Sequence, residues 1–314
     1  MPKLITWNIQ SARSAGGGAD LGHVVGTLDR LSSFDVLCLQ EVACGFHARD
    51  GSRLEDQFAG LGARLPGFSA SWAAPVDTLA PDGARCRLGT LVFSRYPVLQ
   101  VLRHSLPWPA DPGVMSMPRA ALEVTLGTPA GPLRVVSVHL EYFSALQRGA
   151  QVDRLRELHR EAVTHAHAPP VGTPGAADNS AFAAVPRAAP AVLLGDFNML
   201  PGSPEYARLL APFADGTPAL RDAWHLAHPG RPHAPTVGLH NDATDAGMPF
   251  TFDFAFVSTD LAGRVRRLQV DGAATGSDHQ PLLLELAWGR YRQAARRAAR
   301  MAVLPAIAVL KEPI

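Results

Sequence analysis

The sequence predicts a single domain of the α/β (α+β) class. Its opening reads strand, helix, strand, because an apolar run at 3–9 is followed by helical spacing of apolar residues at 21–31 and by a second apolar run at 36–39. Further along, apolar runs at 120–126 and 133–139 flank a Pro/Gly turn and read as an antiparallel hairpin. A mixture of helix-linked and hairpin-linked strands is typical of this class.

Length and composition fit a soluble globular protein, since the 314 residues are 47% hydrophobic and 18% charged. Polar residues suited to catalysis are spread from Asn8 to His279, so both ends of the chain must meet at one site. We therefore predict one catalytic domain over 1–289. An Ala/Pro/Gly-rich stretch at about 168–190 is expected to be a flexible insertion, and 290–314 a basic helix followed by an apolar tail.

The charge distribution argues against a protein that grips duplex DNA. Residues 290–314 hold six bases and one acid, so the remaining 289 residues carry 23 bases and 27 acids, a net charge of −4. Binding to DNA phosphates favours a basic surface. Nucleic acid stays open as a substrate, but duplex DNA is not favoured.

The expected location is the cytoplasm. Three cysteines (Cys38, Cys44 and Cys86) make no disulfide framework, which fits a reducing compartment. The start of the chain has no apolar signal-peptide core, and no apolar run approaches the roughly twenty residues needed to span a bilayer. The sequence gives no indication of oligomeric state.

The middle of the chain is read more coarsely. A helix is expected over Leu54–Leu61, then loop as far as Arg87. Strands follow at Leu88–Phe93 and Val98–Leu102. A longer helix runs from Ser144 to about His165, with apolar residues at helical spacing.

The last part of the chain starts with a short helix at Ser203-Pro204-Glu205, where Ser is the cap and Pro the first helical residue. Residues 229–249 read as loop, and Phe252–Ser258 and Pro281–Trp288 as the last strands. A basic, Ala-rich helix is expected at 290–303.

One motif organises the chemistry. The apolar run Ala191–Leu194 ends on Gly195, and Asp196 and Asn198 follow where the chain leaves the sheet. In an extended chain, positions two apart point the same way, so the two side chains can reach one site. The ordinary alternative is an Asx turn after a strand.

Other apolar runs end on, or contain, residues that bind metal or phosphate: Asn8, Glu41, His139, Asp253, Asp278 and His279. The order Asn, Glu, His, Asp-x-Asn, Asp, Asp-His resembles the endonuclease/exonuclease/phosphatase superfamily, whose fold is like that of deoxyribonuclease I. Ser94-Arg95-Tyr96-Pro97 matches a further signature. The resemblance runs from about Ile5 to Leu286 and implies a four-layer sandwich, two packed, mostly antiparallel sheets flanked by helices.

The resemblance also implies a divalent metal at the strand-end loops. Mg²⁺ prefers oxygen ligands and is held by one or two carboxylates together with substrate phosphate. Glu41 is the first candidate for a metal ligand, with Asn8 and Asp278 beside it, and Mn²⁺ is a substitute. A surface glutamate at a strand end is the alternative for Glu41.

Catalytic roles follow from the same resemblance. His279 is expected to meet the phosphate or the attacking water, with Asp253 orienting its imidazole. Asp196 would position or deprotonate the water, and Asn198 would donate to a phosphate oxygen. His139 looks like a second histidine beside the phosphate. The chain departs from the family at this point. Family members with this histidine have a supporting glutamate shortly before the Ser-Arg-x-Pro segment, where this chain offers only Asp77 and Asp82 in a loop. Gly89-Thr90 stands where a Gly-Asn is frequent.

Arg119 is a candidate for binding the substrate, with a structural or solvated arginine as the alternative. Tyr142 is a second candidate for substrate binding. For Tyr142 and for Glu141, the alternatives are lining the pocket and a position in the core or at its rim. Four histidines lie among Pro and Gly residues with no cysteine partner, which favours a solvated loop over a zinc site. They are His225, His228, His233 and His240.

The function expected is a divalent-metal-dependent phosphoesterase that hydrolyses a phosphodiester with a water activated by His and Asp. Within enzymes, the alternatives are a nuclease, a lipid phosphodiesterase and a small-molecule phosphomonoesterase, because the fold does not fix the substrate. From another class, a non-catalytic binding module that kept the fold predicts loss of the polar set. The expected partner is the phosphate-ester substrate.

Overall fold

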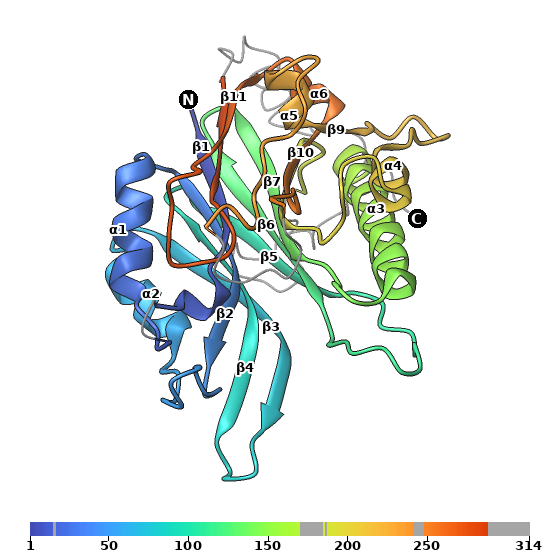
Figure 1. The fold of residues 1–314 in the computed structure, drawn as a ribbon. Coiled ribbons are helices and arrows are strands. Elements are labelled where there is room, and N and C mark those ends of the chain that lie inside the picture. Colours follow the sequence, from blue (N-terminus) through green and yellow to red (C-terminus); the bar gives the residue numbers. More distant parts are fainter. Residues whose placement is uncertain (15–16, 170–184, 186, 241–247, 288–314) are drawn as a thin grey trace, which may run out of the picture.

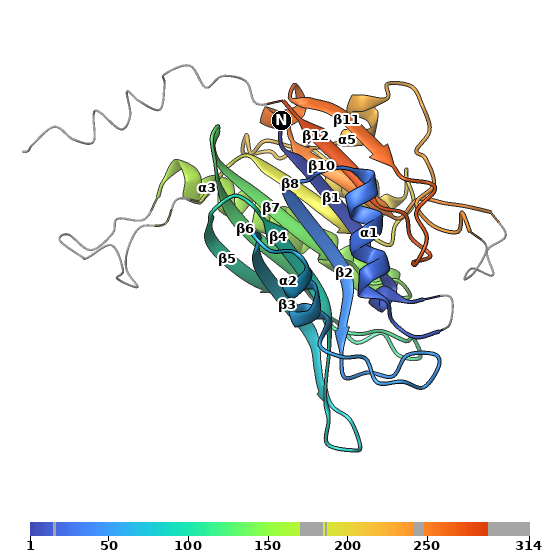
Figure 2. The ribbon, with the colours of Figure 1, turned by 90° about the vertical axis from the view of Figure 1, so that its left-hand side faces the viewer.

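The computed structural model describes residues 1–14, 17–169, 185, 187–240 and 248–287. Two six-stranded sheets pack face to face, and helices cover their outer faces (Figures 1 and 2). This arrangement confirms the α/β (α+β) class and the four-layer sandwich.

The first sheet has the strand order β11-β12-β1-β2-β4-β3. Its central pair, β1 and β2, is parallel, and every other neighbour in the order is antiparallel. The parallel pair results from the crossover through α1 (Leu21–Leu31). The strands are β1 (Lys3–Asn8), β2 (Val36–Cys44), β3 (Ser69–Leu79), β4 (Arg85–Ser94), β11 (Val265–Val270) and β12 (Leu282–Leu286).

The second sheet repeats this plan in the order β5-β6-β7-β8-β10-β9, with β7 and β8 as its parallel pair. The crossover passes through α3 (Ala145–His167). Both sheets are therefore mostly antiparallel, as expected. The strands are β5 (Val98–Ser105), β6 (Ala120–Thr128), β7 (Gly131–His139), β8 (Ala191–Asp196), β9 (Leu220–Asp222) and β10 (Asp253–Ser258).

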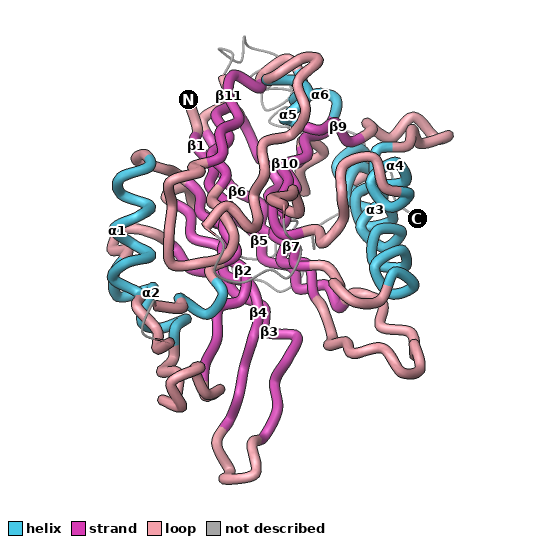
Figure 3. Tube along the Cα trace, in the orientation of Figure 1, coloured by secondary structure: helices cyan, strands magenta, loops and turns pink. Residues whose placement is uncertain are grey.

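Side-chain caps fix where the helices begin. Asp20, Asp56, Ser144 and Ser203 each accept a hydrogen bond from a main-chain N–H of the first turn that follows. Figure 3 shows α1 and α2 on one side of the sandwich and α3 and α4 on the other. The remaining helical segments are η1 (Gln10–Ala12), α2 (Gln57–Arg64), α4 (Pro204–Leu210), α5 (Ala223–Ala227) and α6 (Thr259–Ala262).

Three apolar layers hold these elements together. Between the sheets, Leu4 and Val36 pack with residues of the second sheet such as Val192 and Leu194. A second layer joins the outer face of the first sheet to α1 and α2, and a third joins the outer face of the second sheet to α3 and α4. Because the central strands are buried on both faces, their sequences are continuous apolar runs.

The topology brings many strand ends to one edge of the sandwich. The carboxyl ends of the parallel pairs β1–β2 and β7–β8 lie there, as do the amino ends of their antiparallel neighbours β12 and β10. The two sheets meet at this edge, where Asn8 at the end of β1 donates to Asp196 at the end of β8.

Several sequence predictions are wrong in detail. The loop expected before Arg87 contains the whole of β3, an edge strand whose outer half is exposed and which pairs only with β4 in the described sheet. The helix expected at 54–61 begins three residues later, after Asp56. Strand β2 passes through Glu41 instead of ending there, and the short elements β9, α5, α6 and β11 were not anticipated.

The predicted insertion at 168–190 and tail at 290–314 lie mostly or wholly outside the described residues. Within the described part of the chain, no helix has the length and apolarity to cross a membrane. The three cysteines are free thiols, and Cys38 is buried, as its strand predicts.

Candidate active site

Three polar residues lie side by side in the second sheet. The register pairs Asp196 with His139 on one neighbouring strand and with Asp253 on the other. All three are buried, with less than a tenth of their surface exposed. Loss of hydration from buried polar groups requires compensation by partners, and those partners come from the first sheet and from loops of both sheets.

His279 provides the main partner for Asp253. The Nδ1 atom of His279 lies 2.8 Å from Asp253 Oδ2, and Thr236 Oγ1 donates to the same oxygen at 2.7 Å. The other ring nitrogen, Nε2, faces Asp196 Oδ2 at 3.7 Å. Burial lowers the pKa of the His279 imidazole, but the carboxylates of Asp253, Asp196 and Asp278 outweigh burial and raise it to about 10.

Asp196 occupies the centre of the cluster. Burial, together with the charge of Asp253, raises the pKa of the Asp196 carboxyl to about 7, against the opposing effects of His279 and of the Asn8 amide. The pKa of the Asp196 carboxyl and that of the His279 imidazole are thus both raised. Each group therefore exchanges its proton outside its ordinary pH range.

Asn8 joins two carboxylates across the sheets. Its Nδ2 atom donates to Glu41 Oε1 at 2.9 Å and to Asp196 Oδ2 at 3.0 Å. Its Oδ1 atom accepts from the main-chain N–H of Gln10 at 3.0 Å. The amide thus holds Glu41 and Asp196 beside each other, where two negative charges would otherwise repel.

Glu41 lies at an irregularity in β2. The register between β2 and β4 shifts between Leu39 and Val42, and Glu41 has a φ of 55°. A left-handed backbone at a non-glycine residue is uncommon and is typical of a β-bulge that re-aims a side chain. The Glu41 side chain keeps 28% of its surface exposed, so it is accessible from solvent.

Asp278 has one oxygen bound and one free. Gln10 Nε2 donates to Asp278 Oδ2 at 2.9 Å. Asp278 Oδ1 is buried and has no hydrogen-bond partner among the described residues, while His279 Nε2 lies 4.0 Å from it. A buried carboxylate oxygen without a donor is the kind of atom that binds a cation.

His139 completes the cluster on the other side. Its Nε2 atom lies 3.5 Å from Asp196 Oδ2 and 4.0 Å from Glu41 Oε1. Burial, with the nearby charges of Arg119 and His279, holds the pKa of His139 well below its usual value. The imidazole is therefore neutral and faces the two carboxylates.

Asn198 reaches the site by a different route from the one expected. Its main-chain N–H donates to Asp196 Oδ1 at 2.9 Å, which is an Asx turn, and its φ of 48° takes it out of the strand. Its Nδ2 atom donates to the carbonyl of Leu140, the residue after His139. Strand alternation therefore does not relate Asp196 and Asn198, although a turn keeps them adjacent.

Arg119 is buried and paired. Its Nε atom donates to Glu141 Oε2 at 3.2 Å, and the Glu141 carboxylate also accepts from the main-chain N–H of Phe143. The NH1 atom of Arg119 is buried with no hydrogen-bond partner among the described residues. The Arg119 guanidinium, which is close enough to lower the pKa of His139, therefore has an NH1 donor without a partner among the described residues.

Tyr142 is half exposed and belongs to an aromatic row beside the site. Its ring lies 4.7 Å from that of Phe143 and 6.0 Å from that of Phe252, and Phe252 in turn lies 4.6 Å from Phe250. Phe252 directly precedes Asp253. This row could not be predicted from the sequence, because its members come from two distant segments.

Four residues that support the cluster were missed by the sequence reading: Trp7, Gln10, Thr236 and Ser277. Trp7 Nε1 donates to the main-chain carbonyl of His279, and Ser277 Oγ bridges the carbonyl of Asn8 and the N–H of His279. Trp7, Gln10 and Ser277 sit within two residues of predicted site residues, which was the available signal. Thr236 lies in a predicted loop with no local signal.

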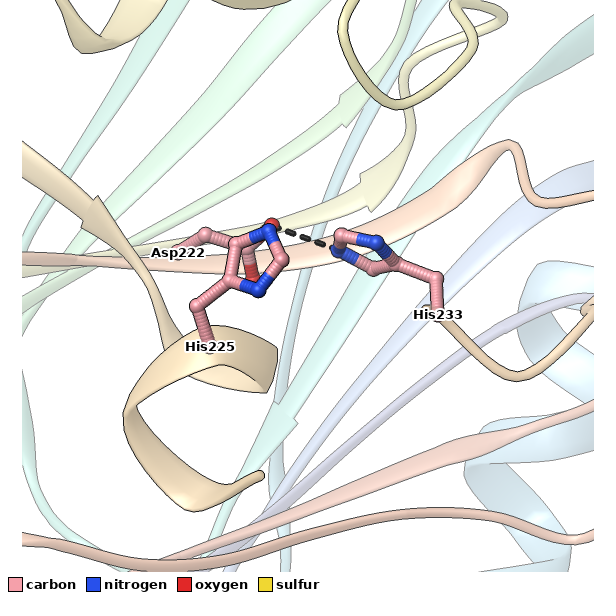
Figure 4. A group of neighbouring side chains, drawn as sticks. All are labelled: Asp222, His225 and His233. Atoms are coloured by element: carbon pink, nitrogen blue, oxygen red, sulfur yellow. Dashed lines mark hydrogen bonds and ion pairs between the residues drawn. The ribbon is translucent and has the colours of Figure 1, made fainter. Parts of the chain in front are cut away.

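The expected solvated loop of histidines is wrong for two of them. His233 Nε2 lies 2.7 Å from Asp222 Oδ2, with 7% of the His233 side chain exposed, and His228 Nε2 contacts the carbonyl of Leu268 at 2.8 Å. Figure 4 shows His225 turned toward the Asp222–His233 pair. His225 is on helix α5, whereas His240 is exposed, as expected.

Within the described part of the chain, two groups of side chains offer ligand atoms within 4.8 Å of one another: Asp222, His225 and His233 form one, and Asp196, Asp253 and His279 the other. In each group a carboxylate is already bound to a ring nitrogen. Tyr206 also donates to Asp222 at 2.7 Å, and Trp224 N to its other oxygen. The first group is therefore a satisfied hydrogen-bond network, while the second opens on Asp278 and Glu41.

Comparison with known structures shows the same fold. An endonuclease/exonuclease/phosphatase from Bacteroides vulgatus is 20% identical, with a TM-score of 0.64, over 92% of this chain and 99% of that one. A mannosyl-6-phosphatase of Bacteroides thetaiotaomicron is 18% identical (TM-score 0.61; 92% and 100% covered). A 3′ phosphatase from Neisseria, bound to a product DNA hairpin, is 20% identical (TM-score 0.58; 92% and 100% covered).

No curated protein sequence matches the chain. The model of the Endonuclease/Exonuclease/phosphatase family, in contrast, matches residues 5–279, a span that begins within β1 and closes on His279. The chain therefore belongs to the endonuclease/exonuclease/phosphatase family and is a hydrolase of phosphate ester bonds.

Proposed function

We propose that the protein hydrolyses a phosphodiester with the help of a divalent metal ion. The observation that carries this proposal is the cluster itself. Two carboxylates, two imidazoles and an amide from both sheets (Glu41, Asp196, His139, His279 and Asn8) are linked by contacts of 4.0 Å or less. Such a set can neutralise a phosphate, position water and move a proton, which are the needs of phosphate-ester cleavage.

The donor set fits Mg²⁺, with Mn²⁺ as a substitute. Asp278 Oδ1 is buried without a donor among the described residues, and Glu41 presents a partly exposed carboxylate. Hard cations of this kind take oxygen ligands and keep sites for water and phosphate. We assign Asp278 and Glu41 as ligands. Asn8 is better suited to orienting Glu41, because its Oδ1 atom already accepts from Gln10.

A bound divalent ion would supply charge neutralisation on the phosphate. The protein's own residues account for the rest. Asp253 holds Nδ1 of His279, so Nε2 is left to donate to a phosphate oxygen. Asp196, at the centre, accepts a proton from the attacking water or orients it. His139 lies beside Asp196, where it can contact phosphate.

Substrate binding extends to the rim of the cluster. Arg119 keeps a free NH1 donor near His139, suited to a phosphate oxygen. Asn198 still has one amide hydrogen beyond its bond to Leu140, and it can donate to the same group as charge builds in the transition state. Tyr142 offers an exposed ring for an organic substituent.

A phosphomonoester is the second candidate substrate. Two proteins of the same fold are named a mannosyl-6-phosphatase and a 3′ phosphatase, and both names describe cleavage of a terminal phosphate. A monoester places one more negative charge in the site than a diester does. The acidic total of residues 1–289 counts against duplex DNA in either case.

The test compares bis(p-nitrophenyl) phosphate with p-nitrophenyl phosphate, each with Mg²⁺, with Mn²⁺ and with a chelator. We expect metal-dependent release of p-nitrophenol, faster from the diester. Faster release from the monoester would replace the first candidate by the second. Full activity in chelator would refute the metal requirement, and no activity on any phosphate ester would favour a binding module.

A further inference from the structure

A pocket of about 290 Å³ opens next to the proposed metal ligands. Glu41 and Gln10 belong to both places, since each lines the pocket, Glu41 contacts Asn8, and Gln10 donates to Asp278. The other wall is the loop after β2, from Phe46 to Leu54. The pocket volume lies at the lower end of the range for small-molecule sites, about 300–1,000 Å³.

The rim of this pocket carries two arginines without acidic partners. Arg49 makes no ion pair among the described residues, and its neighbour Asp50 accepts from Ser52 instead. Arg13 donates to the neutral side chain of Gln10 at 3.2 Å and likewise has no ion pair there. Elsewhere in the same region Arg53 pairs with Asp82. Glu41 is the acid among the lining residues, and its contact is with Asn8, so it does not pair with either arginine.

The pocket also has an apolar side. Phe46, Leu54 and Leu88 line it together with the aliphatic part of the loop, and His47 adds an exposed imidazole at the rim. Apolar and cationic side chains in one pocket suit an organic group that ends in an anion. Guanidinium groups bind phosphate through two parallel hydrogen bonds, and free arginines at a pocket mouth are suited to that task.

We propose that this pocket is a specificity subsite for a small phosphate ester whose organic substituent carries a second anionic group. The scissile phosphate lies at the cluster of Glu41, Asp196 and His279, the organic group fills the pocket, and Arg13 and Arg49 bind the second anion. This assignment rests on the proposed function for the position of the scissile phosphate, and it adds the class of substrate.

A matched pair of substrates tests it. Thymidine 5′-(p-nitrophenyl phosphate) and the same compound with an added 3′-phosphate differ by one anionic group. We expect the bisphosphate to have a kcat/KM about tenfold higher, mainly through KM, which is the size of one charge-assisted hydrogen bond. The advantage should shrink as salt is raised, because Arg49 is exposed and Arg13 is only half-buried.

The variant Arg49→Gln should remove most of that advantage and leave the kcat/KM of the singly charged substrate within about twofold of wild type. Among the described residues the Arg49 side chain makes no hydrogen bond or ion pair that folding would need, so the variant should fold. Arg13→Lys keeps the charge and should retain part of the advantage. Arg64→Gln is the control, because Arg64 is exposed on helix α2, donates only to Gly60 within its own helix and lies outside the pocket.

Equilibrium binding separates this proposal from the proposed function. Calorimetry in chelator, where metal-dependent turnover stops, compares thymidine 3′,5′-bisphosphate with thymidine 5′-phosphate. We expect tighter binding of the bisphosphate by wild type and a much smaller difference between the two ligands for Arg49→Gln. Equal binding by wild type would overturn the subsite even if the enzyme is active. An undiminished preference in Arg49→Gln, or tighter binding of oligothymidylate than of the bisphosphate, would also overturn it.

Discussion

The indole N–H of Trp7 donates to the main-chain carbonyl of His279 at 2.9 Å, across 272 positions of sequence. Trp7 is fully buried in the layer between the first sheet and α1. The hydrogen bond therefore anchors the loop of His279 to the first strand of the chain.

Replacing this indole tests the anchor. Trp7→Phe leaves the His279 carbonyl without its donor and removes buried volume, so we expect the free energy of unfolding to fall by about 2–4 kcal/mol. Urea denaturation measures this. The control is Trp108→Phe, since Trp108 is half exposed and donates to Ser116, and its change should stay below about 0.5 kcal/mol. Equal losses in both variants would contradict the anchoring role.

The central pair of the cluster should be indispensable for turnover. His279→Ala and Asp196→Ala are each expected to lower kcat at least about a hundredfold, the range for a group that transfers or orients a proton. Initial rates with bis(p-nitrophenyl) phosphate give the measurement, and circular dichroism confirms that each variant is folded. A folded variant that turns over at near wild-type rate would refute the role given to its residue.

Gly195 should tolerate no side chain. It has a φ of 143°, and a Cβ atom there would lie 2.0 Å from the main-chain oxygen of Val138. Because the obstacle is backbone of the adjacent central strand, Gly195→Ala is expected to cost on the order of 3 kcal/mol or more. Thermal denaturation checks the loss.

Gly149 supplies the matched comparison. It lies in α3, where an added Cβ atom meets nothing within 4 Å. Gly149→Ala should raise the free energy of unfolding by about 0.5–1 kcal/mol, because alanine loses less backbone entropy in a helix. Similar effects of the two substitutions would show that the close contact at Gly195 is relieved by movement of the strands.

Acidification should weaken the protein through His159. Burial, with the charge of Arg134, lowers the pKa of His159 to about 4. Its Nε2 atom contacts the carbonyl of Pro218 at 2.8 Å and so carries the proton, while Nδ1 accepts from Arg134. Between pH 6.5 and 4 the unfolded chain binds a proton that the folded one does not, so stability is lost as pH falls through this window.

Wild type must be compared with a His159 variant at each pH, because Asp196 also changes its protonation in an overlapping pH range. The gap in unfolding free energy between wild type and His159→Gln should narrow by up to ~3 kcal/mol as pH falls from 6.5 to 4. A gap that stays constant across the window would show that His159 has an ordinary pKa.

The fold could be predicted wherever a strand is buried on both faces. Leu4, Leu37 and Leu194 belong to such strands, and their apolar runs mark the centre of each sheet. Strand β3 was not predicted, because it is an edge strand that is exposed at both ends, and its Ala, Ser and Pro carry no clear alternation of apolar and polar residues. Strand β11 is likewise an edge strand, and its two arginines are exposed.

The candidate site could be predicted as a set of residues but not as a set of contacts. The order from Asn8 to His279 is readable along the chain, whereas the bulge at Glu41 depends on how β2 pairs with β4. The bond from Gln10 to Asp278 and that from Thr236 to Asp253 join segments that no periodicity relates. Which residues pair in this way depends on the tertiary packing of the whole domain.

The pairing of β12 against β1 has a consequence for synthesis. Strand β12 is Leu282–Leu286, it fills a central place beside the first strand, and His279 directly precedes it. A nascent chain that has not yet released these residues from the ribosome has an unpaired edge on β1 and lacks one imidazole of the cluster. A truncated product ending before His279 should therefore be inert toward phosphate esters and prone to aggregate through that edge.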